Sequence, residues 1–151
     1  MQPSEGLTVF VYTIYMMINY IAVVGAAVAS MIIGGLWYGP LFGKIYIRAM
    51  GWENKSPAEK KAMQKGMMWS YLWQFIASIL SFYVLARFMN ATGELSVAGG
   101  MVVAFWGWLG FILPMKFGDM LWGGKKATFW LSIFSSLITF LVAGAILGYW
   151  H

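Results

Sequence analysis

Four long apolar stretches, separated by shorter polar ones, set the pattern of this chain. Each has about the 20 mostly apolar residues that an α-helix needs to cross the hydrocarbon core of a membrane. The pattern predicts an all-α integral membrane protein, a single domain over residues 1–151 with four transmembrane helices. The predicted spans are residues 18–38, 67–87, 96–115 and 127–150, and the predicted loops on one side are 39–66 and 116–126.

The end of the first stretch has the order of residues that a chain meets on leaving a bilayer. An apolar run leads into Trp37-Tyr38, then into Gly39-Pro40 and finally into Lys44. That order matches hydrocarbon, aromatic belt, helix stop and charged loop. Residues 41–50 carry Lys44 and Arg48 on one face, which predicts a short interfacial helix after the first span.

Three further signals concern helix boundaries. Ser56-Pro57-Ala58-Glu59 is a capping box with proline at the first helical position, so the second helix is predicted to begin in water before its apolar part. Pro114 cannot donate a hydrogen bond to Gly110, which predicts a bend near the end of the third span. Residues 7–17 either extend the first helix or lie at the membrane surface.

The lysines and arginines predict the orientation. Nine of the ten lie in the two predicted loops, and only Arg87 lies on the opposite side. Because cytoplasmic loops carry the excess of Lys and Arg, both loops are predicted to be cytoplasmic and both termini to lie on the outer side of a cytoplasmic (inner) membrane. The loop residues are Lys44, Arg48, Lys55, Lys60, Lys61, Lys65, Lys116, Lys125 and Lys126.

Composition narrows the chemistry. Hydrophobic residues make up 61% of the chain and charged residues 10%, there is no cysteine, and the one histidine is His151. Thiolate metal sites and disulfides are therefore excluded, and buried histidine ligation within the chain is not available. With no catalytic triad, carboxylate pair or phosphate-binding loop, we expect no enzymatic activity and no cofactor. The net charge of +5 reflects membrane orientation, so no nucleic-acid partner is expected.

Small residues recur four positions apart in the first and fourth stretches. This spacing lets membrane helices approach closely, either within one four-helix bundle or along the seam of a homo-oligomer. The predicted packing positions are Gly25, Ala29, Ser30, Gly34, Gly144 and Gly148.

Polar residues form stripes on the second and fourth stretches. Because unpaired polar groups are costly in hydrocarbon, the two faces turn inward, where they hydrogen-bond one another or line a polar path centred on Gln74. The stripes consist of Ser70, Gln74, Ser78 and Ser81, and of Thr128, Ser132, Ser135 and Thr139. No ionisable residue lies at the middle of a span, which argues against an ion-coupled transporter.

The two loops bring a third group of residues to the same membrane depth. They form either an ordinary interfacial belt with solvated charges or a notch that binds the headgroup of an anionic lipid. Asp119, the only acid in the second loop, is placed where it could pair with Lys116, or with Lys44 of the first loop and so hold the two loops together. The group consists of Trp37, Tyr38, Lys44, Arg48, Lys116, Asp119 and Trp122.

The run from Gly34 to Lys44, read as Gly-x-Leu-Trp-Tyr-x-Pro-x-Phe-Gly-Lys, resembles the signature of a family of small bacterial membrane proteins of unknown function. Asn19-Tyr20 is similar to the opening of that family's pattern. Leu121-Trp122 and the run 144–150 look like its later landmarks. The resemblance implies a four-span membrane fold and supplies no reaction.

Three functions fit these observations. The first is a structural or accessory multi-pass membrane protein that acts through helix–helix and lipid contacts, as a homo-oligomer or as a subunit of a larger membrane complex. The second is a small channel or facilitator for uncharged or hydrophobic solutes, which a cavity reaching past Gln74 would favour. The third is an anionic-lipid-binding module at the cytoplasmic leaflet.

Overall fold

The structure, a computed structural model, describes residues 18–151 together with Gly6, Thr8 and Val9. Four of the helices formed by these residues are long and apolar enough to cross a membrane, and a short helix, α3 (Gly43–Met50), follows the first of them. The predicted all-α, four-span architecture with a short helix after the first span is therefore confirmed. The alternatives for residues 7–17 fall, apart from Thr8 and Val9, outside the described residues.

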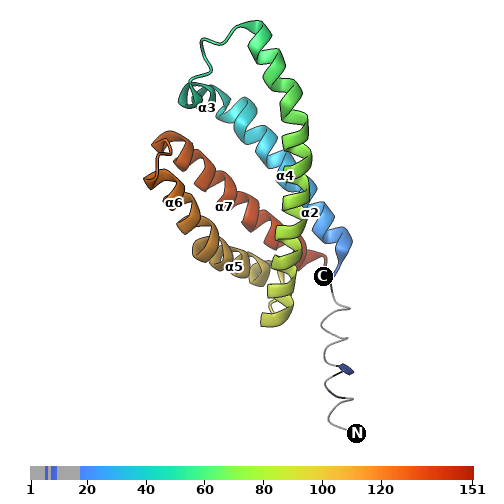
Figure 1. Ribbon diagram of the computed structural model, residues 1–151. Coiled ribbons are helices and arrows are strands. Elements are labelled where there is room, and N and C mark those ends of the chain that lie inside the picture. The colour runs from blue at the N-terminus through green and yellow to red at the C-terminus, as the bar shows by residue number, and fades with distance from the viewer. Residues whose placement is uncertain (1–5, 7, 10–17) are drawn as a thin grey trace.

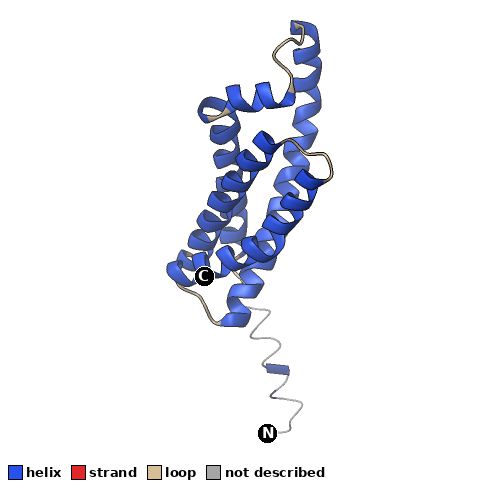
Figure 2. Ribbon diagram, turned by 90° about the vertical axis from the view of Figure 1, so that its left-hand side faces the viewer, coloured by secondary structure: helices blue, strands red, loops and turns tan. Residues whose placement is uncertain are grey.

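The first spanning helix consists of α2 (Tyr20–Leu36) and η1 (Trp37–Leu41). Asn19 caps its start, since its Oδ1 accepts hydrogen bonds from the backbone N–H of Ile21 at 3.0 Å and of Ala22 at 3.2 Å. The chain kinks at Gly39, just before Pro40, where φ is −101° and ψ is −105°. The kink re-aims the backbone, so that α3 lies across the bundle rather than along it (Figure 2).

The second spanning helix, α4 (Pro57–Thr92), is much longer than the apolar stretch within it. Its capping box is formed as the sequence predicts: Ser56 Oγ accepts from Glu59 N at 3.3 Å, and Glu59 Oε2 accepts from Ser56 N at 2.8 Å. Gly93, in the left-handed conformation at φ 73°, ends the helix. Thirty-six residues at 1.5 Å each span about 54 Å, whereas the hydrocarbon core is about 30 Å thick. The first turns of α4 therefore extend beyond the membrane.

The third spanning helix is built from α5 (Val97–Gly107), η2 (Trp108–Ile112) and α6 (Leu113–Leu121). The wider π turn η2 ends two residues before Pro114, and the helix continues past the proline as α6. Residues 116–121, which the sequence analysis placed in the second loop, are thus helical. They stay helical because Lys116 and Asp119, three apart, share one face and leave the rest of α6 apolar. The loop shrinks to residues 122–125.

The fourth spanning helix, α7 (Lys126–Tyr149), is the centre of the bundle. It packs against α5 on one side and α2 on the other, while α4 packs mainly on α2 (Figure 1). The contact with α5 is close because glycines meet: a Cβ on Gly144 would lie 2.7 Å from the carbonyl carbon of Gly100 and 2.8 Å from Ala104 Cβ. Such small residues let two backbones approach in a membrane.

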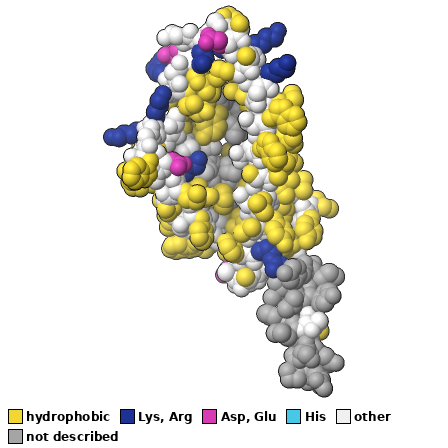
Figure 3. Space-filling model, in the orientation of Figure 1, with side chains coloured by type: hydrophobic (Ala, Val, Ile, Leu, Met, Phe, Trp, Pro, Cys, Tyr) yellow, Lys and Arg dark blue, Asp and Glu magenta, His cyan; other side chains and the backbone are white. Residues whose placement is uncertain are grey.

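Besides a smaller cluster of Trp108, Phe129 and Ile133, the main apolar core occupies one half of the bundle, near the described start of α2 and the end of α7. We call this half the terminal end, and the half that carries α3 and residues 122–125 the basic end. Most of the Lys and Arg side chains in view gather at the basic end (Figure 3). The buried core at the terminal end includes Ala22, Val23, Ala26 and Ala27 of α2, Phe82, Leu85 and Met89 of α4, Ala104 of α5, and Ala143 and Leu147 of α7.

Candidate functional site

A cavity of about 890 Å³ occupies the basic half of the bundle. It lies between α2, α4, α6 and α7, because the basic half of α4 leans away from α7 while its other half packs into the core (Figure 1). The hollow opens on the surface of the protein (Figure 3). The four walls therefore enclose a cleft that begins among charged residues and runs toward the middle of the spans.

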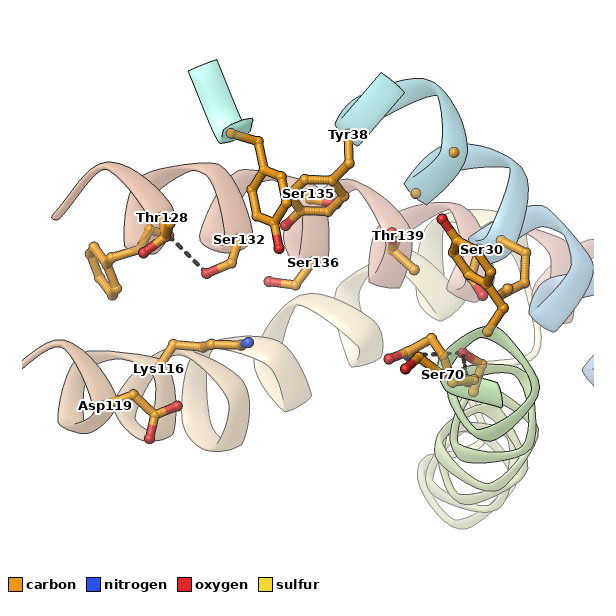
Figure 4. A pocket seen from close by; sticks show the side chains of 18 of the residues that line it. Ser30, Tyr38, Ser70, Lys116, Asp119, Thr128, Ser132, Ser135, Ser136 and Thr139 are labelled. Carbon is orange, nitrogen blue, oxygen red and sulfur yellow. Dashed lines mark hydrogen bonds between the residues drawn. The ribbon is translucent and has the colours of Figure 1, made fainter. Parts of the chain in front are cut away.

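Both polar stripes identified in the sequence face this cavity. Figure 4 shows Ser132, Ser135 and Thr139 of α7 on one wall and Ser70 of α4 across from them. Gln74 and Ser78 line the α4 wall as well, and Gln74 Nε2 points to Ser78 Oγ at 3.5 Å. The two stripes thus stand apart across the hollow instead of pairing directly with each other.

Most of the serine and threonine hydroxyls of the wall donate their protons to the backbone rather than to the cavity. Six of the nine serine and threonine residues in the lining donate to a backbone carbonyl oxygen of their own helix segment, at 2.7–2.9 Å. A hydroxyl has one proton and two lone pairs, so these six residues offer acceptors to the hollow. The six are Ser30, Ser78, Ser81, Thr128, Ser132 and Ser136, and the other three are Ser70, Ser135 and Thr139.

Aromatic residues from the first spanning helix and α3 line the entrance. Tyr38 of η1 faces Ser135 of α7, and both residues line the cavity. Its ring lies edge-on to Tyr46 with centroids 5.0 Å apart, and Tyr46 lies edge-on to Trp52 at 5.6 Å. This chain of rings fixes α3 against the mouth of the cavity.

Two charged side chains of α6 lie at the mouth. Lys116 extends into the hollow, and Asp119 lies one turn further toward the loop (Figure 4). Between the described residues, the structure pairs Asp119 with neither Lys116 nor Lys44, so the predicted ion pair between the loops is not formed. Lys125 joins the two segments instead, because its Nζ donates to the Ala49 carbonyl oxygen at 2.6 Å, near the C-terminal end of α3.

The other residues of the predicted headgroup notch lie outside the cavity. Trp37 Nε1 donates to the Leu131 carbonyl oxygen at 3.1 Å, which ties the first helix to α7. Arg48 forms an ion pair with Glu53 at 3.2 Å, Lys44 is exposed, and Trp122 is 92% exposed. The notch therefore reduces to Tyr38, Lys116 and Asp119, which join the polar stripes in one site.

The cavity ends before it reaches the terminal end. Its lining stops at Ser30 of α2, Phe82 of α4 and Phe140 of α7. Phe82 is 2% exposed and lies edge-on to Phe140, with ring centroids 5.8 Å apart. Beyond them begins the apolar core, so the cavity opens at the basic end and is closed toward the other face.

The predicted packing positions divide into two groups. Gly144 and Gly148 lie at the contact of α7 with α5. A Cβ added at Gly25 would lie 3.4 Å from the Trp150 ring, and Ala29 is partly buried in α2. Ser30 and Gly34, in contrast, line the cavity. A Cβ added at Gly34 meets no atom within 4 Å, so this glycine faces open space rather than another helix.

Ser136 is a site residue that the sequence analysis did not select. Its Oγ donates to the Ile133 carbonyl oxygen and accepts from Trp108 Nε1 at 2.9 Å, which joins η2 to α7. It lies four residues after Ser132, so helical spacing admits it as well as Ser135, which lies three residues after Ser132 and was chosen for the stripe. Among the described residues, no three His, Cys, Asp or Glu side chains lie close enough to hold a metal ion.

Comparison with known families gives one match. A family model described as "Protein of unknown function (DUF1761)" matches residues 21–148, which is most of the chain. The chain belongs to the DUF1761 family. All the serines and threonines that line the cavity of this DUF1761 protein fall within the match. Comparison with curated proteins and with solved structures gives no significant match. The site thus lies in the part of the chain that defines the family, whose description carries no activity.

Proposed function

We propose that this multi-pass membrane protein is a non-enzymatic lipid-binding protein whose cavity receives the headgroup of an anionic lipid. The basic end is placed on the cytoplasmic side in this proposal, so the lipid enters from the cytoplasmic leaflet. The observation that carries it is the cavity itself: a hydroxyl-lined hollow in the basic half of the bundle, open to the protein surface there, with Lys116 extended into it.

A hollow of this kind needs a polar occupant. Backbone and side-chain polar groups at membrane depth are stable only where they pair with protein, water or ligand. A bundle that acted through packing alone would bring the α4 and α7 stripes together, whereas here they face each other across about 890 Å³. A headgroup fills such a space while its acyl chains remain in the surrounding bilayer.

Two features favour lipid binding over the other functions that the sequence admits. The cavity does reach past Gln74. A channel or facilitator for solutes also needs a path to the opposite face, and the Phe82–Phe140 contact and the apolar core behind it close that path. Lys116 and Lys125 in the lining outnumber Asp119, which favours an anionic over a cationic or neutral headgroup.

Filling the cavity tests the proposal. Gly34→Leu adds a side chain that points into open space in the lining, and Gly107→Leu adds the same side chain at a helical position outside it, where a Cβ also meets nothing within 4 Å. Purified wild type and variants are mixed with equal amounts of phosphatidylglycerol and phosphatidylcholine, and the retained lipid is measured by native mass spectrometry.

Wild type and Gly107→Leu are expected to retain phosphatidylglycerol in preference to phosphatidylcholine. Gly34→Leu is expected to retain at least ten-fold less phosphatidylglycerol than wild type. Equal retention by all three proteins would refute the proposal. The orientation is tested separately with a reporter fused after His151, which is expected to be active only on the outer face; a cytoplasmic signal would reverse it.

A further inference from the structure

The lipid that the cavity receives has a headgroup of defined chemistry, and this inference rests on the proposed function. We infer that the headgroup is a phosphodiester that carries free hydroxyl groups, of the glycerol kind, rather than a bare phosphate or an ammonium group. The inference comes from the direction of the hydrogen bonds in the wall and from the sign of the charge that extends into the hollow.

Six of the nine serine and threonine hydroxyls of the wall present acceptors. Ser30 Oγ donates to the Ala27 carbonyl oxygen at 2.7 Å, and Ser132 Oγ donates to the Phe129 carbonyl oxygen at 2.9 Å, so on α2 and α7 alike the proton is already used. What each serine then offers to an occupant is oxygen lone pairs. An occupant with hydroxyl protons satisfies these oxygens, whereas a bare phosphate, itself an acceptor, leaves them without a donor.

The charge at the mouth selects against the other common donor, an ammonium group. The ionisable lysine and acid side chains of the lining are Lys116, Lys125 and Asp119, two cations and one anion, and Lys116 is the one that extends inward. A phosphate at Lys116 gains a charge-assisted hydrogen bond, and an ammonium group in the same place is repelled. A phosphate flanked by a diol matches both the lysine and the wall.

Competition between two anionic lipids tests the inference. Phosphatidylglycerol carries two free hydroxyls beyond its phosphate, while phosphatidic acid carries none and has at least as much negative charge. Charge alone therefore favours phosphatidic acid, and an acceptor wall favours phosphatidylglycerol. Retention from an equimolar mixture is measured by native mass spectrometry in a polyoxyethylene detergent, which has no sugar head to occupy the cavity.

Wild type is expected to prefer phosphatidylglycerol by roughly five-fold for each hydrogen bond that the hydroxyls form. The double variant Ser30→Ala/Ser132→Ala removes two acceptors while leaving both helices their backbone bonds, and is expected to lower the preference at least five-fold. Thr92→Ala, which removes a hydroxyl that also donates within α4 at 2.9 Å but lies outside the lining, is expected to keep the wild-type preference. Lys116→Gln is expected to lower retention of both lipids and leave their ratio unchanged.

The outcomes separate the inference from the function on which it rests. Equal retention of the two lipids, or a preference for phosphatidic acid, would overturn the inference while cavity-dependent lipid binding stands. Equal lipid retention by Gly34→Leu and Gly107→Leu would refute the proposed function itself. Displacement of the lipid by equimolar soluble glycerophosphoglycerol, the deacylated phosphodiester, would overturn the assignment to a lipid and point to an aqueous compound with the same head chemistry.

Discussion

Replacing Gly144 by alanine tests the contact that holds α7 against α5. The added Cβ would lie 2.7 Å from the Gly100 carbonyl carbon and 2.8 Å from Ala104 Cβ, whereas ordinary contact begins at 3.4 Å. For the carbonyl carbon the shortfall is 3.4 − 2.7 = 0.7 Å, and the Gly100 carbonyl oxygen lies closer still. Because these two atoms belong to a helix backbone, the two helices must separate by at least that distance. A gap of roughly 0.5–1 Å forfeits a quarter to a half of the dispersion energy of the contacts that it opens.

The stability effect follows from two opposing terms. Overpacking of this kind costs about 1–3 kcal/mol, and glycine to alanine within a helix returns about 1 kcal/mol. Gly107→Ala, in the same spanning helix as Gly100, gains only the helix propensity of alanine and has no overpacking cost, since a Cβ there meets no atom within 4 Å. The difference between the two variants isolates the steric term.

Thermal unfolding in detergent, followed by the intrinsic fluorescence of the nine tryptophans, measures this difference. A steric term of about 1–3 kcal/mol corresponds to a separation of roughly 2–12 °C in Tm for a chain of this size. Gly144→Ala is expected to melt below Gly107→Ala by that amount. If the two variants melt together, α5 and α7 do not touch at this crossing and the packing described for the bundle is wrong.

Three further predictions concern single polar contacts. A double-mutant cycle on Trp108→Phe and Ser136→Ala is expected to give a coupling of about 0.6–1.7 kcal/mol in unfolding free energy. A coupling of zero would show that the hydrogen bond between η2 and α7 is not formed. Lys125→Met is expected to increase proteolytic cleavage next to α3 without lowering Tm, because it removes only the bond to Ala49; unchanged cleavage would contradict that contact. Ser56→Ala is expected to cost about 1 kcal/mol and to speed amide exchange in the first turn of α4, and unchanged exchange there would show that the cap contributes nothing.

Helix identity follows directly from the sequence because it depends on local composition. About 20 apolar residues in a row specify a membrane helix whatever they pack against. The start of α4 is equally local, since Ser56 and Glu59 satisfy each other's backbone groups. The end of the third helix is not local: residues 116–121 look like a charged loop, and they are helical because one polar face turns toward a cavity that the sequence does not display.

The polar helix faces of the candidate site could be predicted from the sequence, but their arrangement around a cavity could not. The periodicity of Ser70, Gln74 and Ser78 identifies a polar face, but no pattern says whether two such faces meet or stand apart. That outcome depends on the angle between α4 and α7, which is set by packing at the terminal end. For the same reason Ser30 and Gly34 match a packing motif by spacing and yet line an open space.

The π turn between α5 and α6 precedes the charged residues of the cavity in the same spanning helix. A π turn holds one residue more than an α turn. Deleting Gly110, inside η2, would return the segment to α-helical winding and leave the residues after it in nearly the same orientation, whereas inserting one residue into regular α6 before Lys116 would rotate everything after it by about 100°. Lys116 and Asp119 would swing out of the hollow on such an insertion although neither had been altered. The register of this helix, rather than the identity of the charged residues alone, sets the electrostatic character of the entrance.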